Sequence, residues 1–327
     1  MKKTVISMAL THCDHIADLV NGTLKVEGVK VNHMQLLLHD IFQRVTGFAD
    51  FDVAEMSMAK YASLRSQSDN RYIALPVFLS RVCRHSAIYV RKDRIKSRED
   101  FVGKRIGVPE WAQTAAVFGR GILSDDLAIP LNQVEWVQAG LATAGRLEKV
   151  ALKLPPGLRL AHVSDLSLTD LLSCGRIDAL IAADPPTCFG RDVNIDRFFP
   201  NFEAVEREYV SRTRIFPIMH TVVVRSELLL DHPWLAGNLF SAFAEAKRNS
   251  LARLHQEGVT SAPLPWIAQA VARAKETLGD DFWPYGVEAN RPTLAAFVRW
   301  AFEQGVCHRL LTPEELFAPQ TRDAVKV

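Results

Sequence analysis

The amino-acid sequence predicts an α/β protein with two lobes, in which mixed, mostly parallel sheets surround a central cleft. Strand-length apolar segments alternate with helix-length segments along most of the chain, which is typical of βαβ units. The length of 327 residues corresponds to two domains of about 150 residues each. Hydrophobic residues make up 48% of the chain and charged residues 23%, a composition that allows a large buried core.

The first third of the chain carries six predicted strands, each a short run of apolar or β-branched residues. The last of them closes at Pro109, because proline lacks the backbone N–H that a strand needs. Helices are predicted between the strands, over residues 34–42 and 114–123. The six strands are predicted at residues 5–10, 31–38, 51–57, 72–78, 85–90 and 105–109.

The same alternation continues in the second half. A helix over residues 164–174, with Ser164 or Ser167 as its N-cap, precedes a buried strand at 179–183. Another buried strand is predicted at residues 221–224. Three further helices follow, and the first has its apolar residues mainly on one side; they span residues 233–254, 266–278 and 293–304.

The charged segment 91–100 and the segment 207–217 are the predicted crossings between the lobes. With both as crossings, residues 1–100 plus 211–327 form a discontinuous first lobe, and residues 101–210 form an inserted second lobe. In open α/β sheets, ligands bind in the crevice outside the carboxyl ends of the strands. We therefore expect the ligand site in the cleft between the lobes.

The charge balance and the cysteines exclude several classes of protein. Lys and Arg total 39 against 37 Asp and Glu, whereas nucleic-acid binding needs a basic stripe. No apolar run approaches the ~20 residues of a membrane span. The five cysteines form no CxxC pair, and the apolar N-terminal stretch lacks a signal-peptide cleavage site. We expect a cytoplasmic, reduced protein without nucleic-acid or membrane partners; whether it forms a homo-oligomer stays open.

Two polar clusters follow predicted strands in the first half. His12 and His15 come after the opening strand. His15 could serve as general acid or base and His12 could bind substrate; alternatives are capping of the next helix by Asp14, or a divalent metal held by the two histidines. Arg81 and Arg84 precede His85 and a buried strand. Guanidinium groups match carboxylate geometry, so this cluster predicts an anion site, with a solvated basic turn as the alternative.

A third cluster follows the strand that ends at Pro109. Glu110 is a candidate proton carrier, on the expectation that burial raises its pKa. Trp111 could form an aromatic wall or belong to the core. Gln113 and Thr114 begin a helix, whose free backbone N–H groups could bind a carboxylate.

The remaining candidates lie in the second half of the chain. Asp184 follows a buried strand and either accepts a hydrogen bond from a ligand hydroxyl or belongs to a turn. Arg212 and Arg214 could reach a ligand from the crossing between lobes. His220 is a candidate acid or base, although a histidine flanked by apolar residues is more often part of a core. No nucleotide-binding or flavin-binding motif is present, so no cofactor is expected.

Six runs of sequence carry a resemblance to a known family: residues 51–58, 76–86, 107–110, 216–220, 281–290 and 311–319. Together they resemble the 4,5-dihydroxyphthalate decarboxylase family over nearly the whole chain. That family is similar in fold to type II periplasmic solute-binding proteins, which implies two α/β lobes around a cleft. The resemblance also implies a carboxy-lyase that converts a dihydroxylated aromatic diacid to protocatechuate and carbon dioxide.

The implied reaction needs cations for the carboxylates, a base for the phenol and an acid for the ring carbon. On this basis Arg81, Arg84 and the helix start at Gln113 and Thr114 are expected to hold carboxylates. The candidates for the acid and base roles are His15, His85, Glu110 and His220.

Two departures from the family pattern affect the predicted substrate. The first loop carries His15 where the family usually has Arg, and Asp184 stands where Arg is common. A different hydroxylated aromatic acid is therefore an alternative substrate. A second alternative is a cytoplasmic protein that binds a small acid without turnover, because fold alone does not establish catalysis.

Overall fold

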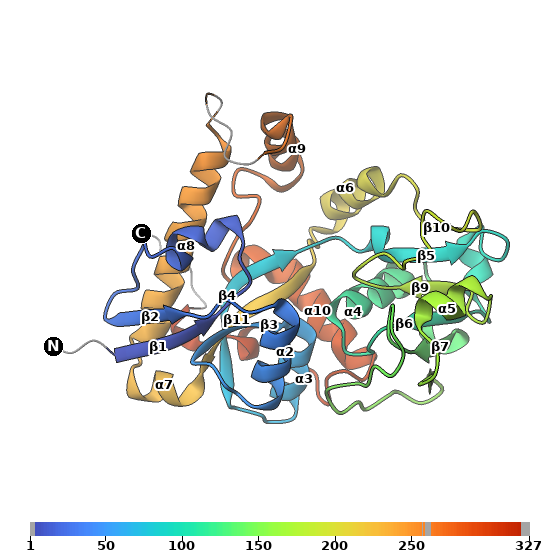
Figure 1. The fold of residues 1–327 in the computed structure, drawn as a ribbon, viewed down its shortest axis with the longest axis horizontal. Helices are drawn as coiled ribbons and strands as arrows, with labels where there is room; N and C mark the ends of the chain where they lie inside the picture. The colour runs from blue at the N-terminus through green and yellow to red at the C-terminus, as the bar shows by residue number, and fades with distance from the viewer. Residues whose placement is uncertain (1–3, 257, 259–262, 322–327) are drawn as a thin grey trace.

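The computed structural model describes residues 4–256, 258 and 263–321. The described strands form two mixed sheets, one in each of two lobes that lie side by side along the long axis (Figure 1). The predicted α/β class with two lobes is confirmed. None of the described helices has the length and apolar character that a membrane crossing requires.

The first sheet has five strands in the order β2-β1-β3-β11-β4. Strand β11 comes from the second half of the chain and pairs antiparallel with both β3 and β4. The first sheet is therefore built from strands of both halves of the chain. Its strands are β1 (Thr4–Ala9), β2 (Val29–His33), β3 (Val53–Ser57), β4 (Tyr72–Arg81) and β11 (Ile218–Arg225).

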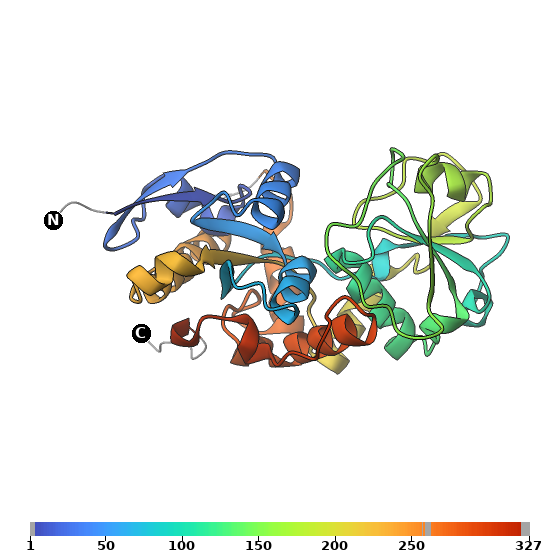
Figure 2. The ribbon, with the colours of Figure 1, turned by 90° about the horizontal axis from the view of Figure 1, so that it is seen from below.

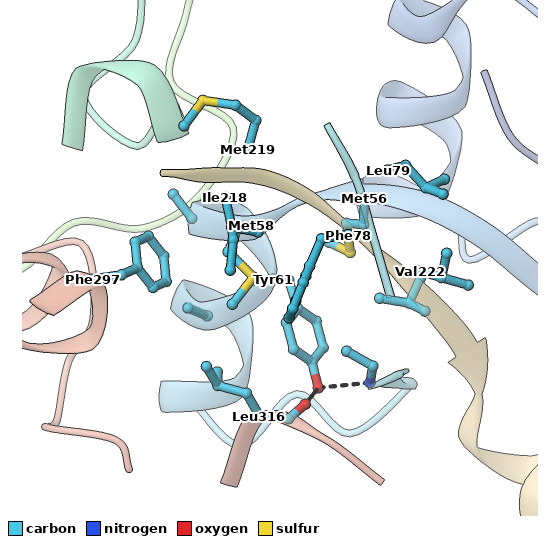
Figure 3. Close-up of a cluster of buried hydrophobic side chains, with 14 of the residues drawn as sticks. Met56, Met58, Tyr61, Phe78, Leu79, Ile218, Met219, Val222, Phe297 and Leu316 are labelled. Carbon is cyan, nitrogen blue, oxygen red and sulfur yellow. Dashed lines mark hydrogen bonds between the residues drawn. The ribbon is translucent and has the colours of Figure 1, made fainter. Parts of the chain in front are cut away.

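Helices pack on the first sheet around an apolar core (Figure 3). Within it, the Tyr61 hydroxyl donates to the Leu316 carbonyl and accepts from the Ala74 backbone N–H at 2.9 Å, so this buried phenol is fully hydrogen-bonded. The helices of this lobe are α1 (Ala17–Val20), α2 (Leu38–Gly47), α3 (Met58–Ser66), α7 (Ser226–Asp231), α8 (Leu235–Leu254), α9 (Ile267–Leu278) and α10 (Arg291–Glu303).

The second sheet has six strands in the order β10-β5-β9-β6-β7-β8. Ser167 caps α5 through a reciprocal hydrogen-bonded pair with Asp170, which confirms one of its two predicted N-caps. The strands are β5 (Ile88–Arg91), β6 (Arg105–Val108), β7 (Glu135–Gln138), β8 (Arg159–His162), β9 (Ala179–Ile181) and β10 (Ile195–Arg197); the helices are α4 (Thr114–Gly121), α5 (Leu168–Ser173) and α6 (Phe202–Thr213).

Single helical turns complete the two lobes. A π-helical turn, Ile122–Asp126, continues α4. The 3-10 turns are Asp14–Ile16, His85–Ala87, Arg98–Phe101, Leu131–Gln133, Glu288–Asn290, Pro313–Leu316 and Pro319–Thr321.

The first crossing between the sheets comes earlier than the sequence predicted. Strand β5 pairs with β9 and β10, so residues 88–91 belong to the second sheet. The chain therefore crosses between β4 and β5, and the charged segment 91–100 follows β5 within the second lobe. The return crossing lies between α6 and β11, inside the predicted segment 207–217.

Helices α4 and α10 join the lobes through a close-packed apolar contact. Phe118 stacks on Phe297 with ring centroids 5.6 Å apart, and it meets Trp300 edge-on at 5.7 Å. A Cβ atom at Gly121 would lie 2.4 Å from the Trp300 ring, so only glycine permits this approach. Figure 2 shows the orange-red C-terminal segment running along one side of the molecule from the first lobe to the second.

Candidate active site

The ends of several strands bring polar side chains to two facing edges. In the first sheet, the carboxyl ends of β1, β3 and β4 lie together with the amino end of β11. In the second sheet, the carboxyl ends of β6, β7 and β9 lie together with the amino end of β5. Ser57 Oγ lies 2.9 Å from Thr114 Oγ1, and Lys60 forms an ion pair with Glu110, so the two edges face each other.

A carboxylate and an imidazole form a pair at the edge of the first sheet. Glu55 lies on β3 and is 2% exposed, and its Oε1 lies 2.6 Å from Nδ1 of His220 on β11. Since His220 pairs with Ser57, Glu55 is its diagonal neighbour on the same face of the sheet. The ladder between β11 and β4 shifts register on both sides of His220, and such irregularities redirect side chains.

Glu55 is held in its ionised form. Burial, the largest single cause, would raise its pKa, but the hydrogen bond and charge of His220 together with the hydrogen bonds from Thr11 outweigh burial, so the pKa of Glu55 is lowered. Its second oxygen accepts a hydrogen bond from the Thr11 backbone N–H at 2.8 Å. The His220 side chain retains 17% exposure, so its imidazole can reach a ligand while Glu55 remains buried behind it.

Arg84 follows strand β4, whose carboxyl end lies at the same edge of the first sheet, and it forms no salt bridge with any described residue. Its Nε contacts the Met219 sulfur at 3.1 Å, and its Nη1 lies 3.5 Å from the Ala183 carbonyl. Among the described residues no carboxylate forms a salt bridge with Arg84, although the guanidinium is buried. Burial lowers the pKa of Arg84 to about 10. A buried cation without a partner favours a bound anion.

Arg81 is also buried, but it is occupied by backbone carbonyls. Its Nη2 donates to the Phe216 carbonyl at 2.9 Å and its Nη1 to the Pro284 carbonyl at 3.3 Å. Its guanidinium lies 4.5 Å from the centre of the Phe216 ring. Burial lowers the pKa of Arg81 to about 9. These contacts leave Arg81 less able than Arg84 to bind a ligand.

Glu110 does not have the raised pKa that the sequence suggested. Its carboxylate is fully buried, but it forms ion pairs with Lys60 and with Arg146, whose Nε lies 2.6 Å away. Burial raises the pKa of Glu110, and the two cations lower it by more, so the net pKa is lowered. The expectation of a burial-raised pKa is wrong, because the sequence did not reveal these two partners. Glu110 therefore links the lobes, because it pairs with Lys60 of the first lobe and with Arg146 of the second.

Helix α4 begins at Thr114, as predicted, but the Thr114 side chain contacts protein. Its Oγ1 accepts the Ala59 backbone N–H at 3.0 Å in addition to its contact with Ser57. The neighbouring Gln113 is half-buried, and its Oε1 has no hydrogen-bond partner. Of the two residues, Gln113 is therefore the one whose side chain is available to a ligand.

Trp111 belongs to the core rather than to a wall of the cleft. It is fully buried, and its Nε1 donates to the Gln304 carbonyl at 2.7 Å. The Arg120 guanidinium lies 3.7 Å from its ring centre, which fixes the indole further. The expectation of an aromatic wall is wrong here, and the core alternative is correct.

His15 and His12 lie after β1, at the same edge as Glu55. Burial lowers the pKa of His15 to about 4, and its ring lies 5.4 Å from the Trp283 ring. His15 is therefore neutral near pH 7 and can only accept a proton there. His12 is exposed. Within the described ranges no group of three His, Cys, Asp or Glu side chains is placed to hold a metal ion.

His85 lies away from the pair. It is fully buried between the rings of Phe199 and Tyr209, at 5.3 and 4.8 Å, and burial lowers its pKa. Its Nε2 lies 3.5 Å from an oxygen of Asp126. Because its ring is enclosed by core residues, the packing does not support a role for His85 as acid or base. The basic residues around it in the sequence gave no indication of this burial.

The candidates near the return crossing face solvent. Arg212 is exposed on α6 and pairs with Asp126 at 2.6 Å and Glu208 at 2.9 Å. Arg214 is exposed at the end of the same helix, in the left-handed conformation with φ 59°. Neither joins the pair, so the expectation that they reach a ligand is not supported. Asp184 is also exposed, but its charge acts on Arg84, which puts it at the rim of the site.

Sequence reasoning missed Glu55, Lys60 and Arg146. The available signal for Glu55 was a single carboxylate inside the otherwise uncharged stretch of strand β3. The same signal existed for Lys60, a lone cation in the first turn of α3 that is 5% exposed. Arg146 lies in a loop, where its sequence context gives no indication of a contact with Glu110.

Comparison with solved structures shows that the fold is periplasmic-binding-protein-like. The aliphatic sulphonate binding protein SsuA from Escherichia coli superposes with a TM-score of 0.53 at 9% identity, over 97% of this chain and 98% of that chain. The alkanesulfonate-binding protein SsuA from Xanthomonas axonopodis gives a TM-score of 0.50 at 9% identity, over 98% of both chains. At these identities the similarity concerns the fold alone.

Sequence comparison identifies the family. A curated 4,5-dihydroxyphthalate decarboxylase from Comamonas testosteroni is 36% identical over 330 aligned residues, which cover 100% of both chains. A second, from Pseudomonas putida, is 39% identical over 191 residues, covering 58% of this chain and 74% of that one. No family model matches the sequence. The chain belongs to the 4,5-dihydroxyphthalate decarboxylase family.

Proposed function

We propose that this protein is a carboxy-lyase that removes one carboxylate from a hydroxylated aromatic acid without oxidation. The substrate we propose is 4,5-dihydroxyphthalate, and the products are protocatechuate and carbon dioxide. The observation that carries this proposal is the 36% identity to the Comamonas testosteroni relative over the full length of both chains. The Glu55–His220 pair and the buried Arg84, which forms no salt bridge with a described residue, lie at the same edge of the first sheet and fit this chemistry.

The reaction needs an electron source and a proton, because direct loss of carbon dioxide would leave an aryl carbanion. The hydroxyl para to the departing carboxylate loses its proton, and the phenolate pushes electrons into the ring. The ring carbon that bears the carboxylate then takes up a proton. Loss of carbon dioxide breaks the carbon–carbon bond, and its electron pair restores aromaticity and the phenolate.

His220 is the proposed proton donor to the ring carbon. Its partly exposed imidazole projects from a buried carboxylate, which is an arrangement suited to proton transfer. Arg84 is the proposed anchor for a carboxylate, because it is buried and forms no salt bridge within the described part of the chain. His15 lies at the same edge and is uncharged near pH 7, so it is the proposed base for the phenol, a role in which the bound substrate has to raise its lowered pKa.

The proposal extends to cofactors and location. Proton transfer and carboxylate anchoring supply the steps written above, so we propose that the enzyme acts without a cofactor. A cytoplasmic location remains part of the proposal, based on the sequence. Asp184 at the rim adds negative charge near Arg84 and favours a second candidate substrate, a hydroxylated aromatic acid with a single carboxylate.

The proposal is tested with a panel of hydroxylated benzoates and phthalates incubated with the purified protein. We expect 4,5-dihydroxyphthalate to be converted to protocatechuate with release of carbon dioxide, measured by chromatography. In D2O the product should carry one deuterium on the ring carbon that lost the carboxylate. Turnover of a monocarboxylic member alone would support the second substrate. Tight binding of one member without turnover of any would instead indicate a binding protein.

A further inference from the structure

We propose that Glu55 is a positioning residue that holds His220 in the tautomer with its proton on Nδ1, which reserves Nε2 for proton exchange with the substrate. The inference rests on the proposed function for its role in turnover. The tautomer itself is a property of the protein without substrate.

The geometry of Glu55 determines which nitrogen carries the proton. An ionised carboxylate can only accept hydrogen bonds. Its Oε2 accepts from the Thr11 backbone N–H at 2.8 Å, and its Oε1 lies 2.6 Å from His220 Nδ1. Nδ1 must therefore be the donor. In the neutral ring Nε2 then carries the lone pair, and in the charged ring Nε2 carries the proton that can be transferred.

The imidazole is held on a second side by an aromatic ring. Phe42 of α2 meets His220 edge-on, with ring centroids 4.9 Å apart and planes at 86°. With Glu55 at Nδ1 and Phe42 against the ring, the imidazole has little freedom to rotate. The orientation of the His220 side chain thus depends on residues from four elements: the ends of β1, β3 and β11, and helix α2.

Glu55→Gln gives a sharp test because the Thr11 N–H still requires an acceptor. The Gln amide oxygen should face Thr11, which turns the amide NH2 towards His220 Nδ1. Nδ1 then becomes the acceptor, and the neutral ring carries its proton on Nε2. A carboxylate–histidine pair forced into the wrong tautomer loses about 10⁴-fold in kcat in serine proteases. For E55Q we expect a loss of ~10²–10⁴-fold in kcat with little change in KM.

The tautomer is measured directly by NMR of protein labelled with ¹⁵N-histidine, at a pH where His220 is neutral. We expect the Nδ1–H form in the wild type and the Nε2–H form in E55Q; the His220→Gln variant identifies the signal. Asp52→Asn is the matched control, because Asp52 also accepts from a backbone N–H and a side chain of the first sheet, both from Ser7. We expect D52N to change neither the tautomer nor kcat.

A double-mutant cycle separates positioning from a structural role. If Glu55 acts through His220, the double variant E55Q/H220Q should have the same kcat as H220Q alone. Losses that multiply in the double variant would overturn the inference, as would an Nε2–H ring in the wild type. If the wild type shows the Nδ1–H form but no acid of the panel is turned over, the proposed function fails while the positioning by Glu55 stands.

Discussion

The two lobes meet in two regions of opposite character. At the α4–α10 contact, aromatic rings pack closely, and Gly121 admits the Trp300 ring where any side chain would collide with it. At the edge of β3 and β11, the side chains are polar and charged, and Arg84 has no salt-bridge partner among the described residues. Close packing leaves no room for a ligand, whereas unbalanced charge favours one.

This difference assigns separate roles to the two regions. The apolar contact fixes the distance between the lobes, because packed rings resist displacement. The ion pair between Lys60 and Glu110 and the Ser57–Thr114 hydrogen bond join the polar edges of the two sheets. These two contacts between the lobes are buried like the aromatic contact but polar like the sheet edge. Substitutions in each region should therefore affect different measured quantities.

The largest expected effect is on stability, from Trp300→Ala at the apolar contact. Trp300 is 1% exposed, and its Nε1 donates to Asp125 at 3.0 Å. Truncation of a large buried aromatic residue costs about 3–5 kcal/mol, which denaturant unfolding should show. Trp266→Ala is the control, because Trp266 is 78% exposed and its loss should change stability little. Equal losses in the two variants would show that the contact does not hold the lobes together.

Glu110→Gln should lower stability by about 3 kcal/mol, because it leaves the buried Lys60 without its counter-ion. The wild type should also show a pH dependence that the variant lacks. The pKa of Glu110 is lowered in the folded chain, so its ion pairs stabilise the fold above the ordinary value of 4.5. This contribution is lost as the pH falls through the lower, folded pKa. Unfolding curves between pH 3 and 6 check the sign; identical pH slopes in both proteins would contradict it.

Arg84→Gln should reduce kcat/KM by about 10–100-fold, mainly through KM, because a charged hydrogen bond to a carboxylate is worth about 1.5–3 kcal/mol. Arg81→Gln should have a smaller effect on KM, since the Arg81 guanidinium already binds two carbonyl groups. Arg212→Gln serves as the control, because Arg212 pairs with surface carboxylates. Unchanged kinetics in both R81Q and R84Q would remove both residues from the site.

The smallest expected effect is from Thr114→Val, which removes a hydroxyl that joins the two edges but keeps its shape. Loss of its hydrogen bonds to Ser57 and the Ala59 backbone should cost about 1 kcal/mol. Thermal unfolding measures this loss. A variant as stable as the wild type would show that the contact adds nothing beyond the α4–α10 packing.

Elements with a clear apolar pattern could be predicted from the sequence. Five elements lie within a few residues of their predicted ranges: strands β1, β6 and β9 and helices α8 and α10. Strands β7, β8 and β10 were not predicted. β7 is only four residues long, whereas β8 and β10 lie at the two edges of the second sheet and carry polar residues. An edge strand with little buried apolar surface has no alternating pattern to detect.

The candidate site could be predicted only in part, because its contacts join residues that lie far apart in the sequence. Arg84 and His220 were expected from their residue types and their positions near strand ends. Glu55 was not, because its contact with His220 depends on β3 pairing with β11, 165 residues further along the chain. His85 and Trp111 carry suitable chemistry but are surrounded by core residues. The type of side chain is readable from a sequence, whereas its non-local neighbours are not.

The position of β11 also determines the order in which the chain can fold as it leaves the ribosome. β11 lies between β3 and β4, so the first sheet stays incomplete until residue 225 has emerged. All strands of the second sheet lie between residues 88 and 197. The lobe encoded in the middle of the chain is therefore the first that can be completed. Until then, β3 and β4 each keep an unpaired edge where β11 will later insert.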